Sequence, residues 1–335
     1  MHLLEHAPQF GLETAKEIAS SEYGISAEVA TLPSERDQNF LLTTSSGEKF
    51  VLKIANALED PAQLDAQEQV LKYLASRVAF CPRVIPTFSG KLLIRLQSDN
   101  FVRMVTYLPG IPLAEVTHQT PELLRDLGRK LGQLDSSLLD FDHPATRRKF
   151  HWDLAHGLQV INEYQGLIND HRLHEVVGQY ADKFARDTGN LWPSLRRSVI
   201  HGDANDYNVL VDHDHQSVCG LIDFGDMVHS YTIADLAIAI AYVVLDKPDP
   251  LAIAVPVVSG YGEAFPLLEN EIAALFGLVL LRLCMSVCLA AEQTRLRPDN
   301  EYLQVSQQSI GNTLPGLLEI DPAVAQHTFR EALSK

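Results

Sequence analysis

The sequence predicts an α+β protein in two lobes, a small antiparallel sheet followed by a mainly helical part. Short β-type segments dominate the first third of the chain, and stretches with helical periodicity dominate the rest. Between them, Tyr107-Leu108-Pro109-Gly110 interrupts the pattern, because proline and glycine break regular structure. We therefore expect an N-terminal lobe at residues 1–107, a C-terminal lobe at residues 108–335, and a ligand-binding cleft between them.

The N-terminal lobe is expected to contain one helix, Pro61–Leu74, which begins with proline at a first-turn position. Its leucines and valine fall on one face, which is typical of a helix that packs on a core. The turn signal Ser45-Ser46-Gly47 separates two of the strand-like segments. The predicted strands are Ala27–Leu32, Asn39–Thr44, Lys49–Ile54, Lys91–Leu96 and Phe101–Tyr107.

The C-terminal lobe is expected to be helical around one short strand-rich segment, Ser198–Asp223. One helical stretch, Ile272–Ala291, is nearly all apolar and long enough to span a membrane. Arg282 at its centre would be costly in lipid, so we predict a buried core helix instead. The predicted helices are Pro121–Leu139, Trp152–Ile168, Leu173–Phe184, Thr232–Leu245 and Glu271–Glu292.

Composition and charge limit the classes of function. The hydrophobic fraction of 46% and the charged fraction of 21% are those of an ordinary globular protein. The formal net charge of −16 repels phosphate backbones, which argues against a nucleic-acid ligand and suits a cationic or zwitterionic substrate. The cysteines are scattered without a C-x-x-C pair, and the N-terminus has no secretory signal pattern. We therefore expect a reduced, cytoplasmic protein with no membrane and no obligate protein partner.

The chemistry candidates lie in two motifs of the strand-rich segment. Val199–Val211 reads V-I-H-G-D-A-N-D-Y-N-V-L-V, in which Asn208 follows Asp203 by five residues. Gly220–Asp226 reads G-L-I-D-F-G-D and supplies Asp223. Phosphoryl transfer needs a residue that orients and deprotonates the attacking hydroxyl, together with ligands for magnesium, and a His-x-Asp with a following Asn and then a D-F-G supplies them. The order and spacing of the two motifs predict a kinase-type site.

Lys53 interrupts an apolar strand, like the lysine of a V-A-I-K strand that contacts the α- and β-phosphates. Because an unpaired buried lysine is costly, we expect a carboxylate partner from the next helix, and the sequence does not choose between Asp65 and Glu68. The alternative is an edge-strand lysine that points into solvent. No G-x-G-x-x-G lies between the first strands. A polar loop, Leu32–Phe40, could instead cover the phosphates through backbone N–H groups and Ser34.

Three further residues could shape a substrate site. Asp206 and Asp226 add carboxylates near the two motifs, a crowding that suits a substrate ammonium group or magnesium. Asp206 could instead cap the local turn. Trp152 is a weaker candidate for the substrate wall, because a tryptophan at the start of a helix is more often part of the core. We expect His201 to brace the loop; the alternative is that it transfers a proton.

These motifs resemble those of the aminoglycoside phosphotransferase/choline kinase superfamily, whose members phosphorylate small hydroxylated amines on a protein-kinase-like fold. The chain is most similar to its hydroxylysine kinase subfamily, and the shared words extend over most of the sequence. They are L-P-S-x-x-D-Q-N-F at Leu32–Phe40, V-L-K-I at Val51–Ile54, T-Y-L-P-G-x-P-x-A-E at Thr106–Glu115, H-G-D-x-N-D-x-N-V-L-V at His201–Val211 and L-I-D-F-G-D-M at Leu221–Met227.

The resemblance implies roles for the residues of both motifs. It implies that Asp203 is the catalytic base and that Asn208 and Asp223 hold Mg²⁺. It also implies that Lys53 contacts the phosphates of ATP or GTP, and the motifs do not choose between these two nucleotides. The N-terminal lobe is accordingly expected to bind the nucleotide.

The resemblance further implies that Thr106, Tyr107 and Leu108, at the hinge, contact the nucleotide base. The expected acceptor is the hydroxyl of a small amine or amino acid, above all 5-hydroxylysine. The alternatives are other small acceptors, namely homoserine, choline, ethanolamine or an aminoglycoside. A non-catalytic nucleotide-binding regulator is the alternative from a different class of protein.

Overall fold

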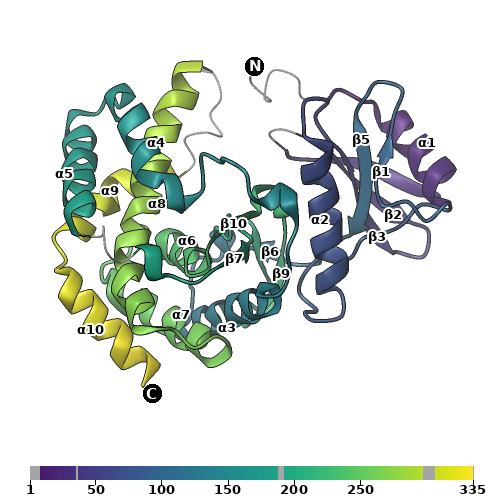
Figure 1. Ribbon diagram of the computed structural model, residues 1–335. Helices are drawn as coiled ribbons and strands as arrows, with labels where there is room; N and C mark the ends of the chain where they lie inside the picture. The colour runs from purple at the N-terminus through teal and green to yellow at the C-terminus, as the bar shows by residue number, and fades with distance from the viewer. Residues whose placement is uncertain (1–7, 35–36, 188–191, 297–305, 335) are drawn as a thin grey trace. The chain divides into compact units, whose positions relative to one another are not determined.

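The computed structural model describes residues 8–34, 37–187, 192–296 and 306–334. The chain divides into two compact units, and most of their helices and strands are labelled in Figure 1. The main change of unit falls between Pro109 and Gly110, inside the proline-glycine break. The first unit comprises Met1–Pro109, His143–Ala145 and Cys219–Gly225, and the second comprises Gly110–Asp142, Thr146–Val218 and Asp226–Lys335.

A five-stranded antiparallel sheet forms the centre of the first unit, in the order β1-β2-β3-β5-β4. Its strands are β1 (Ala27–Leu32), β2 (Gln38–Thr44), β3 (Lys49–Ile54), β4 (Ile94–Arg95) and β5 (Phe101–Thr106). Because side chains alternate along a strand, Leu52 and Ile54 point to one face and Lys53 points to the other. Lys53 lies opposite Arg103 in the β3–β5 register.

Two helices cover the faces of this sheet (Figure 1). α1 (Leu12–Tyr23) packs Ile18 into an apolar core with side chains of β2, β3 and β5. α2 (Pro61–Leu74) brings Glu68 to Arg103 on the opposite face. The face under α2 is therefore the polar face of the sheet, and it carries the predicted phosphate-binding lysine.

The first unit differs from the prediction in two places. α1 was not predicted, because its buried positions include two alanines and give only a weak apolar stripe. It ends at Gly24, whose φ of +69° suits a glycine C-cap. The strand predicted at Lys91–Leu96 is shorter in the structure, where only Ile94–Arg95 pairs with β5.

The second unit is mainly helical, as the sequence predicts. Its helices are α3 (Pro121–Leu138), α4 (Gly157–Tyr164), α5 (His171–Asp187), α6 (Ala234–Val243), α7 (Pro250–Ala264), α8 (Glu269–Leu296), α9 (Gln307–Leu318) and α10 (Pro322–Leu333). By length and composition α8 could cross a membrane, yet 89% of its most apolar window is buried inside the structure. The buried helix predicted from the central Arg282 is therefore confirmed.

Short strands in the second unit carry the loops of interest. β7 (Arg197–Ile200) pairs with β10 (Val228–Tyr231) in antiparallel orientation. β6 (Ile111–Pro112) pairs in the same way with β8 (Val209–Val211). β9 (Val218–Leu221) follows along the chain, belongs to the first unit from Cys219 onward, and leads to the D-F-G segment of that unit.

Several helices of the second unit differ from the prediction. α7, α9 and α10 were not predicted, and the first two contain Pro256 and Pro315 in positions where proline normally ends a helix. The helix predicted at Trp152–Ile168 is shorter, because a 3₁₀ turn at Leu154–His156 precedes α4. Trp152 therefore lies in a turn and does not open a helix.

α3 and α7 approach so closely that their contact requires glycine. A Cβ atom added to Gly128 would lie 1.9 Å from the main-chain oxygen of Val257. A Cβ atom added to Gly260 would lie 1.8 Å from the main-chain oxygen of Arg125. Backbone thus packs directly on backbone, a geometry that only glycine permits.

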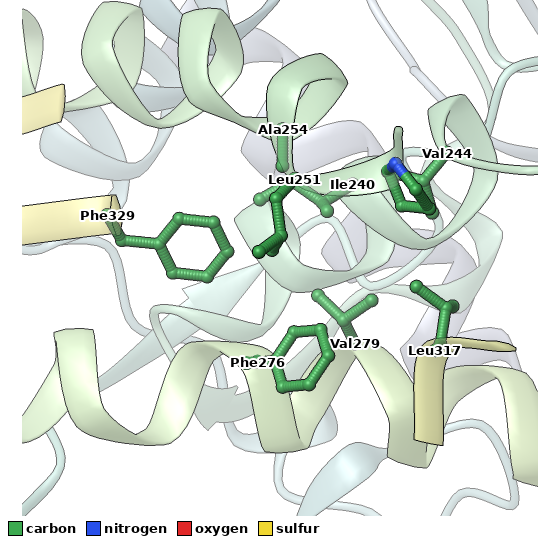
Figure 2. Close-up of a pocket in the computed structure, with 9 residues that line it drawn as sticks. Ile240, Val244, Leu251, Ala254, Phe276, Val279, Leu317 and Phe329 are labelled. Atoms are coloured by element: carbon green, nitrogen blue, oxygen red, sulfur yellow. The ribbon is translucent and has the colours of Figure 1, made fainter. Parts of the chain in front are cut away.

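A small apolar cavity lies among α6, α7, α8, α9 and α10 (Figure 2). Its volume of about 10 Å³ is barely enough for one water molecule, which would find no polar partner there. It is lined by Ile240, Val244, Pro250, Leu251, Ala254, Phe276, Val279, Leu317 and Phe329. The cavity is a packing defect of the core and offers no group for chemistry.

The four cysteines form no disulfide, and three of them are buried. Cys284 and Cys288 lie one turn apart in α8, and Cys81 is buried in the first unit. Burial raises the pKa of Cys81 and of Cys288 to about 12. These thiols therefore act as small core residues.

Candidate active site

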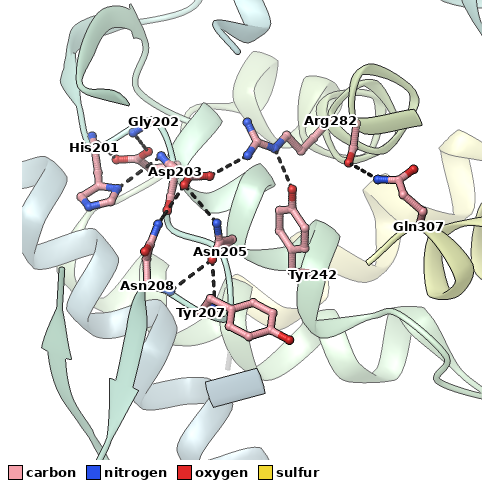
Figure 3. A network of polar contacts seen from close by, with 11 residues as sticks. His201, Gly202, Asp203, Asn205, Tyr207, Asn208, Tyr242, Arg282 and Gln307 are labelled. Atoms are coloured by element: carbon pink, nitrogen blue, oxygen red, sulfur yellow. Dashed lines mark hydrogen bonds and ion pairs between the residues drawn. The ribbon is translucent and has the colours of Figure 1, made fainter. Parts of the chain in front are cut away.

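Asp203 lies at the centre of a hydrogen-bonded loop between β7 and β8 (Figure 3). Its Oδ2 accepts hydrogen bonds from Nδ2 of Asn205 at 3.0 Å and from Nδ2 of Asn208 at 2.8 Å. Its Oδ1 accepts a hydrogen bond from Nη2 of Arg282 at 2.7 Å. The loop thus holds Oδ2 of the predicted base and Arg282 of α8 holds Oδ1, and the predicted spacing of Asp203 and Asn208 brings these two side chains into direct contact.

Arg282 is a residue of this site that the sequence motifs did not reveal. Its side chain is 2% exposed, although it carries a full charge. Its Nε donates to the hydroxyl of Tyr242 at 3.3 Å, and its guanidinium lies 4.4 Å from the ring centroid of Trp152. The one signal in the sequence was a charge inside a twenty-residue apolar stretch, because such a charge is buried only where it has a partner.

A buried carboxylate fixes the backbone of the same loop. Asp235, in the first turn of α6, accepts hydrogen bonds from the main-chain N–H groups of His201 and Gly202, both at 2.8 Å. Gly202 has a φ of +79°, and a Cβ atom there would meet the main chain of Asp226. Nδ1 of His201 accepts from the N–H of Asp203 at 3.2 Å, so His201 braces the loop as expected.

A second buried carboxyl group, that of Asp135, lies within electrostatic reach of Asp235. The hydroxyl of Tyr261 donates to Oδ2 of Asp135 at 2.5 Å, and neither residue is exposed to solvent. Burial, together with the negative charge of Asp235, raises the pKa of Asp135 well above its usual value, while Arg196 opposes the rise. Asp135 therefore keeps its proton in the folded protein over a wide pH range.

We expect Asp135→Asn to remove a pH dependence of stability. The pKa of Asp135 is raised on folding, so the folded state holds a proton that the unfolded state releases above about pH 4. The free energy of unfolding therefore falls as pH rises through this range, by at most about 1.4 kcal/mol per pH unit. Asparagine has no such proton. In urea unfolding, the free energy of unfolding of the variant should therefore increase relative to that of the wild type as pH rises.

The control for this prediction is Asp182→Asn, which changes an exposed aspartate of α5. Its stability relative to the wild type should not vary with pH in the same range. A difference between Asp135→Asn and the wild type that is constant with pH would mean that Asp135 is ionised in the folded protein.

Asp206 and Asp226 lie in the same unit as Asp203. Oδ1 of Asp206 is buried and has no hydrogen-bond partner among the described residues, and burial raises the pKa of this carboxyl group to about 6. Asn205 caps the same local turn, since its Oδ1 accepts from the N–H of Tyr207 at 2.9 Å, and hydrogen bonds from the main chain of Asp206 and Tyr207 oppose the rise in the pKa of Asp206. Asp226 is 9% exposed, and its negative charge helps to raise the pKa of Arg282.

In the first unit, Lys53 faces the aspartate of the D-F-G segment. Its Nζ lies 3.8 Å from Oδ1 of Asp223, and β3 is an interior strand of the sheet. The alternative of an exposed edge-strand lysine is therefore wrong. Asp223 has a φ of +64°, an uncommon conformation for a residue other than glycine, and its Oδ1 accepts from the N–H of Gly225 at 3.1 Å.

The prediction that Asp65 or Glu68 pairs with Lys53 is corrected by the structure, in which both carboxylates have other partners. Oε1 of Glu68 accepts from Nη1 of Arg103 at 3.4 Å, and Oδ2 of Asp65 lies 3.3 Å from Nε2 of His143. Among the described residues, the carboxylate at ion-pair distance from Lys53 is that of Asp223. Arg103 takes Glu68 because it stands opposite Lys53 on β5 and presents a longer, forked side chain.

The charge of Lys53 still acts on Glu68. Glu68 is fully buried, and burial raises its pKa to about 7, while the positive charges of Arg103 and Lys53 oppose the rise. Glu68 therefore lies within the electrostatic reach of both cations. Asp65 is 54% exposed and is not part of this buried group.

The other predicted nucleotide contacts belong to the first unit. Oγ1 of Thr106 accepts from the N–H of Arg83 at 2.9 Å, and the N–H of Tyr107 donates to the main-chain oxygen of Lys49 at 3.2 Å. Leu108 is half-buried, and Ser34 is exposed just after β1. The roles of these four residues at a nucleotide stay predictions.

The two predicted metal ligands fall in different compact units, Asn208 in the second and Asp223 in the first. Both offer oxygen atoms, which Mg²⁺ prefers, and the Nδ2 of Asn208 is already committed to Asp203. Within the described ranges, no group of three or more His, Cys, Asp and Glu side chains could hold a metal ion. Metal binding by this pair stays a prediction.

Comparison with known proteins identifies the family. The Phosphotransferase enzyme family matches residues 28–269. A hydroxylysine kinase of Danio rerio is 33% identical over 326 residues, which cover 92% of this chain and 91% of that relative. Another hydroxylysine kinase, of Mus musculus, is 31% identical over 360 residues, which cover 98% of this chain and 94% of the relative.

A solved structure gives the same fold. Amicoumacin kinase in complex with AMP-PNP, Ca²⁺ and Ami has a TM-score of 0.71 at 16% identity, and the match covers 94% of this chain and 97% of that one. At this identity the likeness shows the fold alone. Together with the family match, it means that this chain belongs to the phosphotransferase enzyme family, has its protein-kinase-like fold and is a small-molecule kinase.

Proposed function

We propose that this kinase transfers the γ-phosphoryl group of ATP or GTP to the hydroxyl group of 5-hydroxylysine. The choice of this acceptor is supported by the similarity of the chain to hydroxylysine kinases over more than nine-tenths of its length. The acidic residues Asp206 and Asp226, in the same unit as Asp203, suit an acceptor with ammonium groups. The match to a homoserine kinase is weaker, at 26% identity over 61% of the chain.

In this proposal the chain's own residues position and deprotonate the acceptor. Asp203 accepts the proton of the attacking hydroxyl, and its bonds to Arg282 and Asn205 keep the carboxylate in place. Lys53 binds the phosphates as a point charge. Asn208 and Asp223 would hold Mg²⁺, which when bound neutralises charge that develops on the phosphates.

A substrate panel tests the proposal. Purified protein is incubated with Mg²⁺, ATP or GTP, and one candidate acceptor: 5-hydroxylysine, homoserine, choline, ethanolamine or an aminoglycoside. We expect release of nucleoside diphosphate that depends on 5-hydroxylysine and exceeds that with every other acceptor. A preference for any other acceptor would reject 5-hydroxylysine, and no acceptor-dependent release at all would reject the proposed reaction.

We expect Asp206→Asn to weaken acceptor binding more than catalysis. The buried Oδ1 of Asp206 has no partner among the described residues, so an acceptor ammonium group can form a charge-assisted hydrogen bond there. Loss of that charge should raise KM for the acceptor about tenfold, equivalent to about 1.4 kcal/mol, with a smaller change in kcat. Steady-state kinetics at fixed nucleotide concentration measures both constants.

The matched control is Asp214→Asn, which removes an exposed carboxylate from the loop after β8. It should leave both constants unchanged. If Asp206→Asn lowers kcat and leaves KM unchanged, Asp206 does not bind the ground-state acceptor.

A further inference from the structure

Arg282 has one donor group that no described residue uses. Its Nη2 donates to Asp203 and its Nε donates to Tyr242. Its Nη1 is buried and has no hydrogen-bond partner in the described ranges. The side chain is only 2% exposed. An unsatisfied buried donor is costly, above all when it is charged, so a partner from outside the chain would stabilise this arrangement.

The surroundings of the guanidinium restrict the chemistry of that partner. Its central carbon, Cζ, lies over the ring of Trp152, 4.4 Å from the ring centroid, and 5.6 Å from the ring centroid of Tyr242. Aromatic rings thus occupy positions against the guanidinium, and the unused donor is an N–H group at its planar edge. An anion with planar oxygen acceptors fits such an edge, and a carboxylate is the group that arginine binds best in this way.

We infer that Arg282 binds the α-carboxylate of the acceptor through Nη1 and thereby selects hydroxylated amino acids over amino alcohols. This inference rests on the proposed function in that the acceptor is an amino acid. Because Asp203 is bonded to the same guanidinium, a short flexible acceptor held there can present its hydroxyl to Asp203. One cation thus orients the base and recognises the substrate.

The charges around Arg282 agree with this assignment. Asp203, Asp206 and Asp226 belong to the same compact unit, and Asp226 acts on Arg282 through its charge. This set has three carboxylates against one guanidinium. An acceptor with two ammonium groups and one carboxylate, such as 5-hydroxylysine, complements it: the ammonium groups meet the carboxylates, and the carboxylate meets the guanidinium.

The test compares two acceptors on two proteins. The acceptors are 5-hydroxylysine and its decarboxylated analogue, which keeps the hydroxyl and both amines. For the wild type we expect kcat/KM to be about 100-fold higher with 5-hydroxylysine, because the analogue leaves the donor unpaired. For Arg282→Lys we expect this ratio to fall below about 10, because an ammonium group lacks the second donor edge. Any effect of the variant through Asp203 lowers both values and cancels in the ratio.

The outcomes separate substrate recognition from positioning. If Arg282 only positions Asp203, the wild type will show little preference between the acceptors, or Arg282→Lys will keep the wild-type ratio; either result overturns the inference. Arg295→Lys, an exposed change on the same helix, serves as the matched control and should leave the ratio unchanged. Thermal unfolding shows whether each variant is folded. If Arg282→Lys is not folded, the inference is judged on the wild-type ratio of the two kcat/KM values alone.

A binding measurement separates this inference from the proposed function. Calorimetric titration of the wild type with 5-hydroxylysine, and with homoserine in parallel, needs no turnover. Binding of an amino acid that is at least tenfold tighter than that of its decarboxylated analogue supports the inference, even if no phosphoryl transfer is seen. Absence of that preference for both amino acids overturns it, even if the protein phosphorylates another acceptor.

Discussion

Asp203→Asn is expected to lower kcat about a thousandfold while nucleotide affinity stays unchanged. The amide cannot accept the proton of the attacking hydroxyl, and a positioned general base contributes about 10²–10⁴ to the rate. Asparagine still offers an oxygen to Nη2 of Arg282, so the loop should keep its hydrogen bond to α8, whereas the amide nitrogen cannot accept the two bonds that Oδ2 of Asp203 receives from Asn205 and Asn208. Steady-state release of nucleoside diphosphate gives kcat, and calorimetric titration with the nucleotide gives the affinity.

The matched control for this prediction is Asp140→Asn, which changes an exposed aspartate after α3. Its kcat should equal that of the wild type. An Asp203→Asn variant that turns over at the wild-type rate would remove Asp203 as the base. A variant that also loses nucleotide affinity would give this residue a role in binding the nucleotide complex.

Gly260→Ala is expected to destabilise the second unit by about 3 kcal/mol. The added Cβ would lie 1.8 Å from the main-chain oxygen of Arg125 on α3, and a backbone atom cannot move aside as a flexible side chain can. The two helices would have to separate, and overpacking of this kind typically costs about 1–3 kcal/mol and occasionally more. Urea denaturation followed by circular dichroism measures the free energy of unfolding.

The control is Gly316→Ala in α9, where an added Cβ meets no atom within 4 Å. Alanine has the higher helix propensity, so this variant should be as stable as the wild type or more stable by up to about 1 kcal/mol. Equal effects of the two substitutions would show that the α3–α7 contact relaxes without loss. The comparison isolates the close approach from the general effect of replacing glycine in a helix.

Local sequence patterns predicted the elements that are stabilised locally. Pro61–Leu74 was predicted with its observed bounds, because its proline and its apolar spacing specify both the start and the buried face. α1 lacked such a stripe, and its small buried residues are explained only by the sheet on which it packs. α7 contains Pro256, so the pattern argued against a helix whose stability comes from its close contact with α3.

The same distinction applies to the site. Asp203 and Asn208 could be placed together because five residues of one loop separate them. Asp235 and Arg282 contact that loop from positions 32 and 79 residues beyond Asp203, and no spacing rule connects them to it. Arg103, which stands opposite Lys53 in the β3–β5 register, likewise takes the place predicted for Lys53 as the partner of Glu68, and no pattern within Pro61–Leu74 indicates this.

The buried thiols give each compact unit a chemical reporter of its own opening. Cys81 belongs to the first unit, and Cys284 and Cys288 belong to the second. Their raised pKa values leave almost no thiolate at neutral pH, and burial keeps alkylating reagents away. Labelling at these sites therefore proceeds only through opened states. Mass spectrometry of the modified peptides can thus measure the opening of the sheet unit and of the helical unit separately.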